Sequence, residues 1–226
     1  MNRSLRLPVL VAACAFVLSS CGNHPGSAAV VGSERIGAGR LDEVASALCS
    51  AQRGSQQSGP TQELASRAAR QGALDVLING SLARQYGASQ GVEPDQKKVS
   101  AALDSNAESI AAIPASRREA FRTTLRDYAE GQLMLVEIGR RALTASGARN
   151  VTEQQAVNEG VRLRDAWARK NVTVSVDPRY GRYTAGALRS TSGSLSAAVS
   201  SSAADGSKSQ PSTSWVSSLP ASQKCS

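Results

Sequence analysis

The sequence is poor in the residues that build metal and cofactor sites. Its 226 residues include one histidine, His24, and four cysteines, none of which form a Cys-x-x-Cys pair. Such a set cannot supply the clustered ligands of a zinc or iron–sulfur centre. The Gly-x-Gly-x-x-Gly and Walker-type phosphate loops are also missing. We therefore expect no metal, no cofactor and no enzymatic activity.

Aromatic residues and acidic residues are also scarce. Aromatics make up 4% of the chain against 41% apolar residues, so a core must be built mainly from Ala, Leu, Val and Ile. Lys and Arg number 26 and Asp and Glu 18, which gives a net charge of 26 − 18 = +8. The length allows one domain or at most two small ones.

The first twenty residues have the features of an export signal. Arg3 and Arg6 precede an uncharged apolar run, Leu7 to Leu18, which is too short to span a bilayer as a permanent helix. The run ends in Leu18-Ser19-Ser20-Cys21, which resembles the bacterial lipobox. The alternative is an ordinary secretory signal followed by an ordinary cysteine.

From this resemblance we expect a lipid-anchored protein. Residues 1–20 form the signal peptide, Cys21 carries the lipid, and residues 21–27 form a short tether that holds His24. Two or three acyl chains are enough for stable anchoring. The protein is then extracytoplasmic, on the outer face of the cytoplasmic membrane. It meets lipid head groups and envelope polymers there, so we expect no nucleic acid among its partners.

Two cysteines remain in the mature chain besides Cys21, since Cys14 lies in the signal peptide. They are Cys49 and Cys225, and an oxidising compartment favours a disulfide between them. Such a bridge would tie the C-terminus to an early helix. The alternative is two unpaired thiols.

Apolar periodicity and end signals predict five helices. Leu41, Val44, Ala45 and Leu48 share one face of the first helix, and the run Gln52–Gly59 interrupts it. Two Ser/Thr-x-x-Glu/Gln patterns, at Ser116 and at Thr152, have the form of capping boxes. Pro94 suits the first position of the third helix. The expected ranges are 41–51, 60–86, 94–113, 116–147 and 152–170.

The period changes after the fifth helix. Val172, Val174 and Val176 alternate with Thr173 and Ser175, as in a strand with one buried face. A single strand is not stable alone, and residues 28–36 carry the other strand signal, so the two ends of the body should pair. From Thr184 onward the chain is rich in serine, and we expect a mostly disordered tail over 184–226.

These features together resemble a known family. Ala29-Val30-Val31-Gly32 leads into the first helix, and Val172-Thr173-Val174-Ser175-Val176 is followed by Asp177-Pro178-Arg179-Tyr180-Gly181. With the lipobox and helical body, residues 28–183 resemble the SurA N-terminal domain of SurA/PrsA-type extracytoplasmic chaperones. The resemblance implies a mainly α fold, with a small sheet that pairs the N- and C-terminal strands.

The resemblance also implies binding of unfolded or partly folded exported polypeptides. Many relatives insert a parvulin isomerase domain before the last helix, but here that junction is only Thr144 to Val151, so isomerase activity is not expected. We expect a client groove on the second to fourth helices, and its candidate residues are Leu77, Leu82, Phe121, Leu125, Tyr128, Leu133 and Val136. A different hypothesis is a structural or adaptor lipoprotein that docks one specific partner.

Two further groups each allow two interpretations. Arg117, Arg118, Arg122 and Arg126 either attract anionic head groups and acidic clients or form the solvated face of the fourth helix. Tyr180 and Tyr183, beside Arg179 and Arg182, either stack on a ligand or cover the edge of the sheet.

Overall fold

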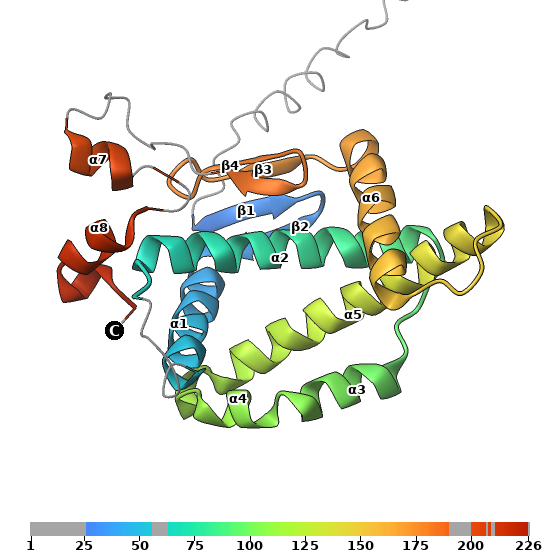
Figure 1. The fold of residues 1–226 in the computed structure, drawn as a ribbon, viewed down its shortest axis with the longest axis horizontal. Coiled ribbons are helices and arrows are strands. Elements are labelled where there is room, and N and C mark those ends of the chain that lie inside the picture. Colours follow the sequence, from blue (N-terminus) through green and yellow to red (C-terminus); the bar gives the residue numbers. More distant parts are fainter. Residues whose placement is uncertain (1–25, 56–62, 190–199, 207, 209–210, 226) are drawn as a thin grey trace, which may run out of the picture.

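The computed structural model describes residues 26–55, 63–189, 200–206, 208 and 211–225, and it is mainly helical with two small antiparallel sheets (Figure 1). The first sheet has the strand order β2-β1-β3. Its strands are β1 (Ser27–Val31), β2 (Glu34–Gly37) and β3 (Val174–Val176). The expected pairing of the two ends of the body is confirmed, because Val30 lies opposite Ser175 in the β1–β3 ladder.

A second hairpin follows directly. It consists of β4 (Arg182–Thr184) and β5 (Ala187–Arg189), joined by Ala185 and Gly186, whose φ values are +51° and +81°. Two positive φ values in a two-residue connection match the twist of antiparallel strands. The sequence-based prediction lacks this hairpin, because residues from Thr184 onward are expected to form the serine-rich tail. The signal was the glycine at the second position of a two-residue turn.

Six helices form the body of the molecule. The two longest helices, α2 and α5, cross each other. The helix α6 packs along the C-terminal half of α5. Figure 1 shows the sheets on one side of α2, with α5, α3 and α4 on its other side. The helices are α1 (Ala38–Ser55), α2 (Ser66–Ser89), α3 (Gln96–Ser105), α4 (Ala107–Ala112), α5 (Ala115–Ala145) and α6 (Glu153–Asn171).

Four helix predictions need correction. The first helix continues past Gln52 to Ser55. Residues 63–65, expected within the second helix, precede α2, which begins at Ser66 and continues past the predicted end to Ser89. The third helix is broken at Asn106 into α3 and α4, and its N-cap is Asp95, whose carboxylate accepts the amides of Lys97 and Lys98. The predicted box at Ser116 is not formed, because α5 already begins at Ala115.

The predicted signals at the α5–α6 connection agree with the structure. The capping box at Thr152 is present with both of its hydrogen bonds to Gln155. At the other end of the α5–α6 connection, Gly147 has a φ of +91° just after the C-cap of α5, which allows the backbone to leave the helix.

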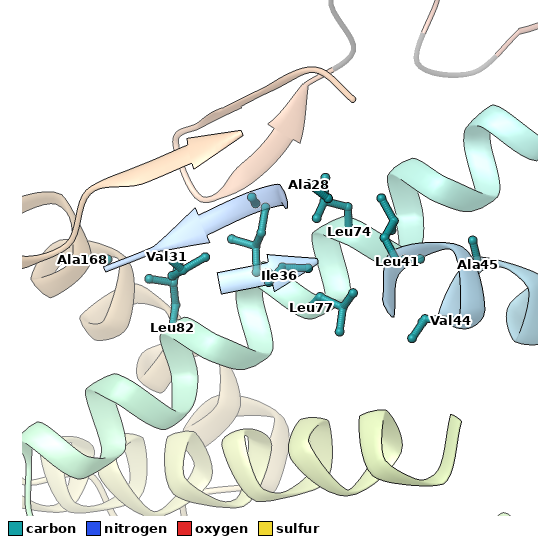
Figure 2. Close-up of a cluster of buried hydrophobic side chains, with 13 residues drawn as sticks. Ala28, Val31, Ile36, Leu41, Val44, Ala45, Leu74, Leu77, Leu82 and Ala168 are labelled. Atoms are coloured by element: carbon teal, nitrogen blue, oxygen red, sulfur yellow. The ribbon is translucent and has the colours of Figure 1, made fainter. Parts of the chain in front are cut away.

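The main core lies between the first sheet, α1 and α2 (Figure 2). Val31 and Ile36 from the sheet meet Leu41 of α1 and Leu74 and Leu82 of α2, all fully buried. A second cluster joins the C-terminal end of α2 to α5 and α6 through Tyr86, Met134, Leu135 and Ile138. Trp167 packs against both clusters, so the two halves of the body share one apolar interior.

The C-terminal segment packs on the body, so the expectation of a mostly disordered tail is wrong for residues 184–189, 200–206 and 211–225. Two short helices, α7 (Ser201–Gly206) and α8 (Thr213–Ser218), precede a 3-10 turn at Ala221–Gln223. The Trp215 ring lies so close to Gly206 that a Cβ there would overlap it. This contact between α7 and α8 and the cross-link at Cys225 order a segment whose serine-rich composition favours disorder.

Candidate functional site

The N-terminal half of α5 carries an apolar stripe. Within the part of the chain that the structure describes, no helix covers this stripe as α6 covers the C-terminal half. At 100° per residue, Phe121, Leu125 and Tyr128 share a face with Leu135 and Gly139. At Leu135 and Gly139, the backbone of α6 packs directly against the backbone of α5. Phe121 and Leu125 are half-buried. Tyr128 is the large apolar side chain that is exposed among the described residues, with 39% of its surface accessible. The stripe therefore passes from a helix interface into solvent.

The predicted client groove also includes Leu77 and Leu82, and this part of the prediction is wrong. Leu77 is 6% exposed and Leu82 0%, and both belong to the core under the first sheet. They face β1 and β2 because the sheet, which the periodicity of α2 could not locate, covers that side of the helix. Leu133 and Val136 are half-buried on α5. The groove residues that stay together are Phe121, Leu125 and Tyr128, which we call the α5 stripe.

A network of alternating charges fixes the N-terminal half of α5 relative to α1, α2 and β2. Asp127 accepts a hydrogen bond of 2.7 Å from Arg40 of α1 and lies 3.8 Å from the guanidinium of Arg84 on α2. Arg84 reaches Glu34 of β2 at 3.1 Å, and the same carboxylate accepts the hydroxyl of Ser81, which is fully buried, at 2.5 Å. These groups are only partly exposed, and each carboxylate is paired with at least one arginine. The network therefore positions α5 and leaves neither carboxylate free for acid–base chemistry.

The basic stretch of α5 divides into separate roles. Arg118 donates to the carbonyls of Ala111 and Ile113, so it caps the C-terminal end of α4. Arg117 lines a small pocket beside the disulfide. Arg122 is exposed and Arg126 half-buried. The four arginines therefore do not form one continuous anion-binding face.

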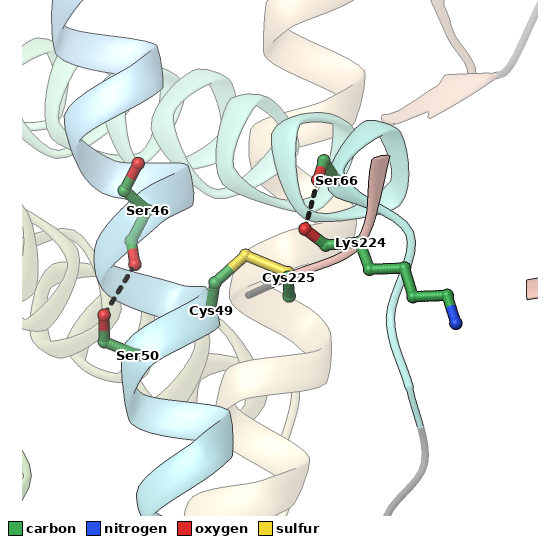
Figure 3. The surroundings of a disulfide bond; sticks show 6 residues. All are labelled: Ser46, Cys49, Ser50, Ser66, Lys224 and Cys225. Atoms are coloured by element: carbon green, nitrogen blue, oxygen red, sulfur yellow. Dashed lines mark hydrogen bonds between the residues drawn. A yellow bond between two sulfur atoms is a disulfide. The ribbon is translucent and has the colours of Figure 1, made fainter. Parts of the chain in front are cut away.

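The disulfide joins Cys49 of α1 to Cys225, the pair that the sequence favoured (Figure 3). Around it, the Ser66 hydroxyl donates to the Lys224 carbonyl at 2.8 Å, and the Cys225 amide donates to the Leu64 carbonyl at 2.8 Å. Lys224 also forms an ion pair with Glu63, which holds the pKa of that carboxyl below its ordinary value. Cys21 and His24 lie outside the described residues.

A pocket of about 180 Å³ lies between the end of α6, β3 and the turn of the β4–β5 hairpin. Two of its polar side chains, Asp165 and Tyr183, are already paired within the protein. Asp165 accepts both hydrogen bonds from the buried Arg164, and the Tyr183 hydroxyl donates to Asn79 at 2.9 Å. Burial raises the pKa of Tyr183 to about 12. The tyrosine therefore packs against the main core, and its hydroxyl is paired within the protein.

A Gly-x-Ser-x-Gly string, Gly87-Ala88-Ser89-Gln90-Gly91, escaped the sequence analysis. In hydrolases this pattern places a serine at a sharp turn between a strand and a helix. Here it ends α2, and Ser89 donates to the carbonyl of Tyr86 at 2.7 Å. The string is a helix terminus, and the Ser89 hydroxyl is engaged by the backbone of its own helix.

Two further properties concern the described ranges. These residues contain no group of three or more His, Cys, Asp or Glu side chains placed to hold a metal ion. Their helices also lack the length and apolar character needed to cross a membrane. Comparisons with protein-family models, with curated proteins and with solved structures gave no match for this chain.

Proposed function

We propose that this chain is a lipid-anchored extracytoplasmic protein that holds non-native exported polypeptides, without isomerase activity. The α5 stripe carries the proposal, since Tyr128 is exposed and Phe121 and Leu125 are half-buried on a helix face that α6 covers farther along. Unfolded chains expose apolar side chains in no fixed order, and a half-buried apolar stripe can bind them by area alone.

The surroundings of the stripe support the same function. The charge network at Asp127 holds the stripe on a rigid helix, so that binding requires no ordering of the protein itself. The α5–α6 connection runs from Ser146 to Thr152, which leaves no room for the isomerase domain that SurA-like relatives insert. The sequence resemblance supports the same assignment, and the lipobox supports the anchor at Cys21.

The direct test is suppression of aggregation of a chemically unfolded protein by the mature chain with Cys21→Ser, which carries no lipid. Tyr128→Asp should lower suppression about tenfold, because it puts a charge on the apolar contact. Tyr128→Phe should retain suppression, since the apolar ring is kept. Thr144→Asp adds the same charge at an exposed position near the end of α5 and should have no effect.

Circular dichroism would show that the variants are folded. Equal suppression by Tyr128→Asp and the parent chain would contradict the assignment of the stripe. No suppression by the folded parent chain would contradict the chaperone function. Crosslinking in the native membrane would then test the adaptor hypothesis, which expects one specific partner.

A further inference from the structure

The β4–β5 hairpin has one buried face and one exposed face. Tyr183 and Leu188 are opposite each other, and both pack against the main core. Side chains alternate along a strand, so the neighbouring pair, Arg182 and Arg189, points away from the core. Both arginines are exposed. The two arginines are thus cross-strand neighbours on the outer face of the hairpin.

This arrangement is unfavourable for an isolated protein. Like charges directly opposite each other in an antiparallel pair repel. The segment 178–189 contains three arginines and no acidic residue. Among the residues that the structure describes, neither Arg182 nor Arg189 has a carboxylate partner. An anion outside the chain would relieve this repulsion.

Two more arginines extend the positive surface. Arg169, exposed in the last turn of α6, lines the pocket at the turn of the hairpin. Arg179, whose side chain is 69% exposed, pairs with Asp177 just before the hairpin. We call Arg169, Arg179, Arg182 and Arg189 the basic hairpin face.

The basic hairpin face lies beside the start of the folded chain. The amide of Asp177 donates to the carbonyl of Ala28 at 2.9 Å, so Asp177 contacts the first residues of β1. Arg179 follows Asp177 by two residues. Gly26 directly precedes β1 and is five residues beyond Cys21. Five extended residues span at most about 18 Å. A lipid on Cys21 would therefore keep this face close to the bilayer.

We propose that the basic hairpin face docks on the surface of a bilayer that contains anionic phospholipids. The phosphate groups would lie against Arg182 and Arg189 and remove their mutual repulsion. The helix α5, which carries the α5 stripe, lies on the opposite side of α2 from the sheets (Figure 1). Docking would therefore leave α5 on the side of α2 away from the membrane. The proposal shares the lipid anchor with the proposed function but does not depend on the binding of clients.

The test is co-sedimentation of the mature Cys21→Ser chain with vesicles, so that only the protein surface can bind. One set consists of phosphatidylcholine alone and the other of equal parts of phosphatidylcholine and phosphatidylglycerol. The variant Arg182→Gln with Arg189→Gln is compared with Arg122→Gln with Arg126→Gln, which has the same net charge but changes α5. Circular dichroism controls for folding.

We expect binding to the anionic vesicles only, weakened by salt. Loss of Arg182 and Arg189 should lower the affinity at least tenfold, and the α5 variant should retain it within about twofold. Equal loss in both variants would overturn the proposal in favour of diffuse attraction. Absence of binding to anionic vesicles would also overturn it, as would full competition by soluble glycerol phosphate at the same head-group concentration. None of these results alters the aggregation assay, so failure here is distinguishable from failure of the proposed function.

Discussion

Gly139 and Gly160 let α5 and α6 approach until backbone lies against backbone. A Cβ at Gly139 would overlap the carbonyl oxygen of Ala156, and a Cβ at Gly160 would overlap that of Leu135. Backbone atoms cannot rotate away as a side chain does, so the helices themselves would have to separate. The contact sets the direction of α6, whose last turn leads into β3.

We predict that Gly160→Ala destabilises the protein by about 2–3 kcal/mol, because it overpacks this crossing. Gly72→Ala is the matched control, since Gly72 lies in α2 with no atom near its missing Cβ. That change should stabilise by about 0.5–1 kcal/mol through helix propensity. Urea unfolding followed by circular dichroism measures both. A similar small effect for the two variants would contradict the close packing of α5 and α6.

The half-buried phenol of Tyr183 predicts a specific loss of stability at alkaline pH. Its pKa is about 12 in the folded protein against an ordinary value of 10.0, so the neutral form is favoured by folding. The unfolded chain loses this proton first as pH rises, so stability is full below pH 10.0 and falls through the folded pKa, by about 2 kcal/mol in all. Tyr183→Phe cannot ionise.

The unfolding free energy of the parent chain should therefore fall with rising pH until it crosses that of Tyr183→Phe. Below pH 10.0 the parent should be more stable by about 1 kcal/mol, because the variant loses the hydrogen bond to Asn79. Above it, the parent's advantage should shrink and then reverse. A difference between the two proteins that stays constant with pH would show that Tyr183 is not buried in this way.

Among the secondary-structure elements, the β4–β5 hairpin carries local strain. Ala185 has a φ of +51°, a value that residues with a Cβ adopt at a cost of about 1 kcal/mol. Asn-Gly is the preferred pair for such a turn. Ala185→Asn should therefore raise the unfolding free energy by about 0.5–1 kcal/mol, and Ala185→Val should lower it by more than 1 kcal/mol. Thermal unfolding tests both, and equal melting temperatures would argue against the positive φ.

Elements with complete local signals could be predicted from the sequence. Thr152 and Gln155 specify the start of α6 by themselves, and the alternating valines specify β3. The break at Asn106 could not be predicted, because Leu103 and Ile110 keep helical spacing across it. Likewise, the sequence pattern places both Leu77 and Tyr128 on the apolar face of a helix and does not show which of them is buried. Only the tertiary fold decides that the first sheet covers Leu77 and that nothing comparable covers Tyr128.

For the whole molecule, the disulfide joins segments 176 residues apart in sequence. Closing so long a loop restricts the unfolded chain and stabilises the fold by up to about 5 kcal/mol. We predict that the variant with both Cys49→Ser and Cys225→Ser unfolds at lower urea and that amide exchange rises over 211–225 before it rises in α2. Hydrogen exchange read by mass spectrometry measures this. Uniform exchange over both regions would mean that the C-terminal segment does not open separately.

The central position of β1 has a mechanical consequence. Its hydrogen bonds to β2 on one side and to β3 on the other run across the strand direction. A pull on the N-terminus along β1 therefore loads both ladders in shear, so that their bonds share the force and must yield together. A tether attached to this strand would transmit tension to the first sheet as a unit and would not peel it open one residue at a time.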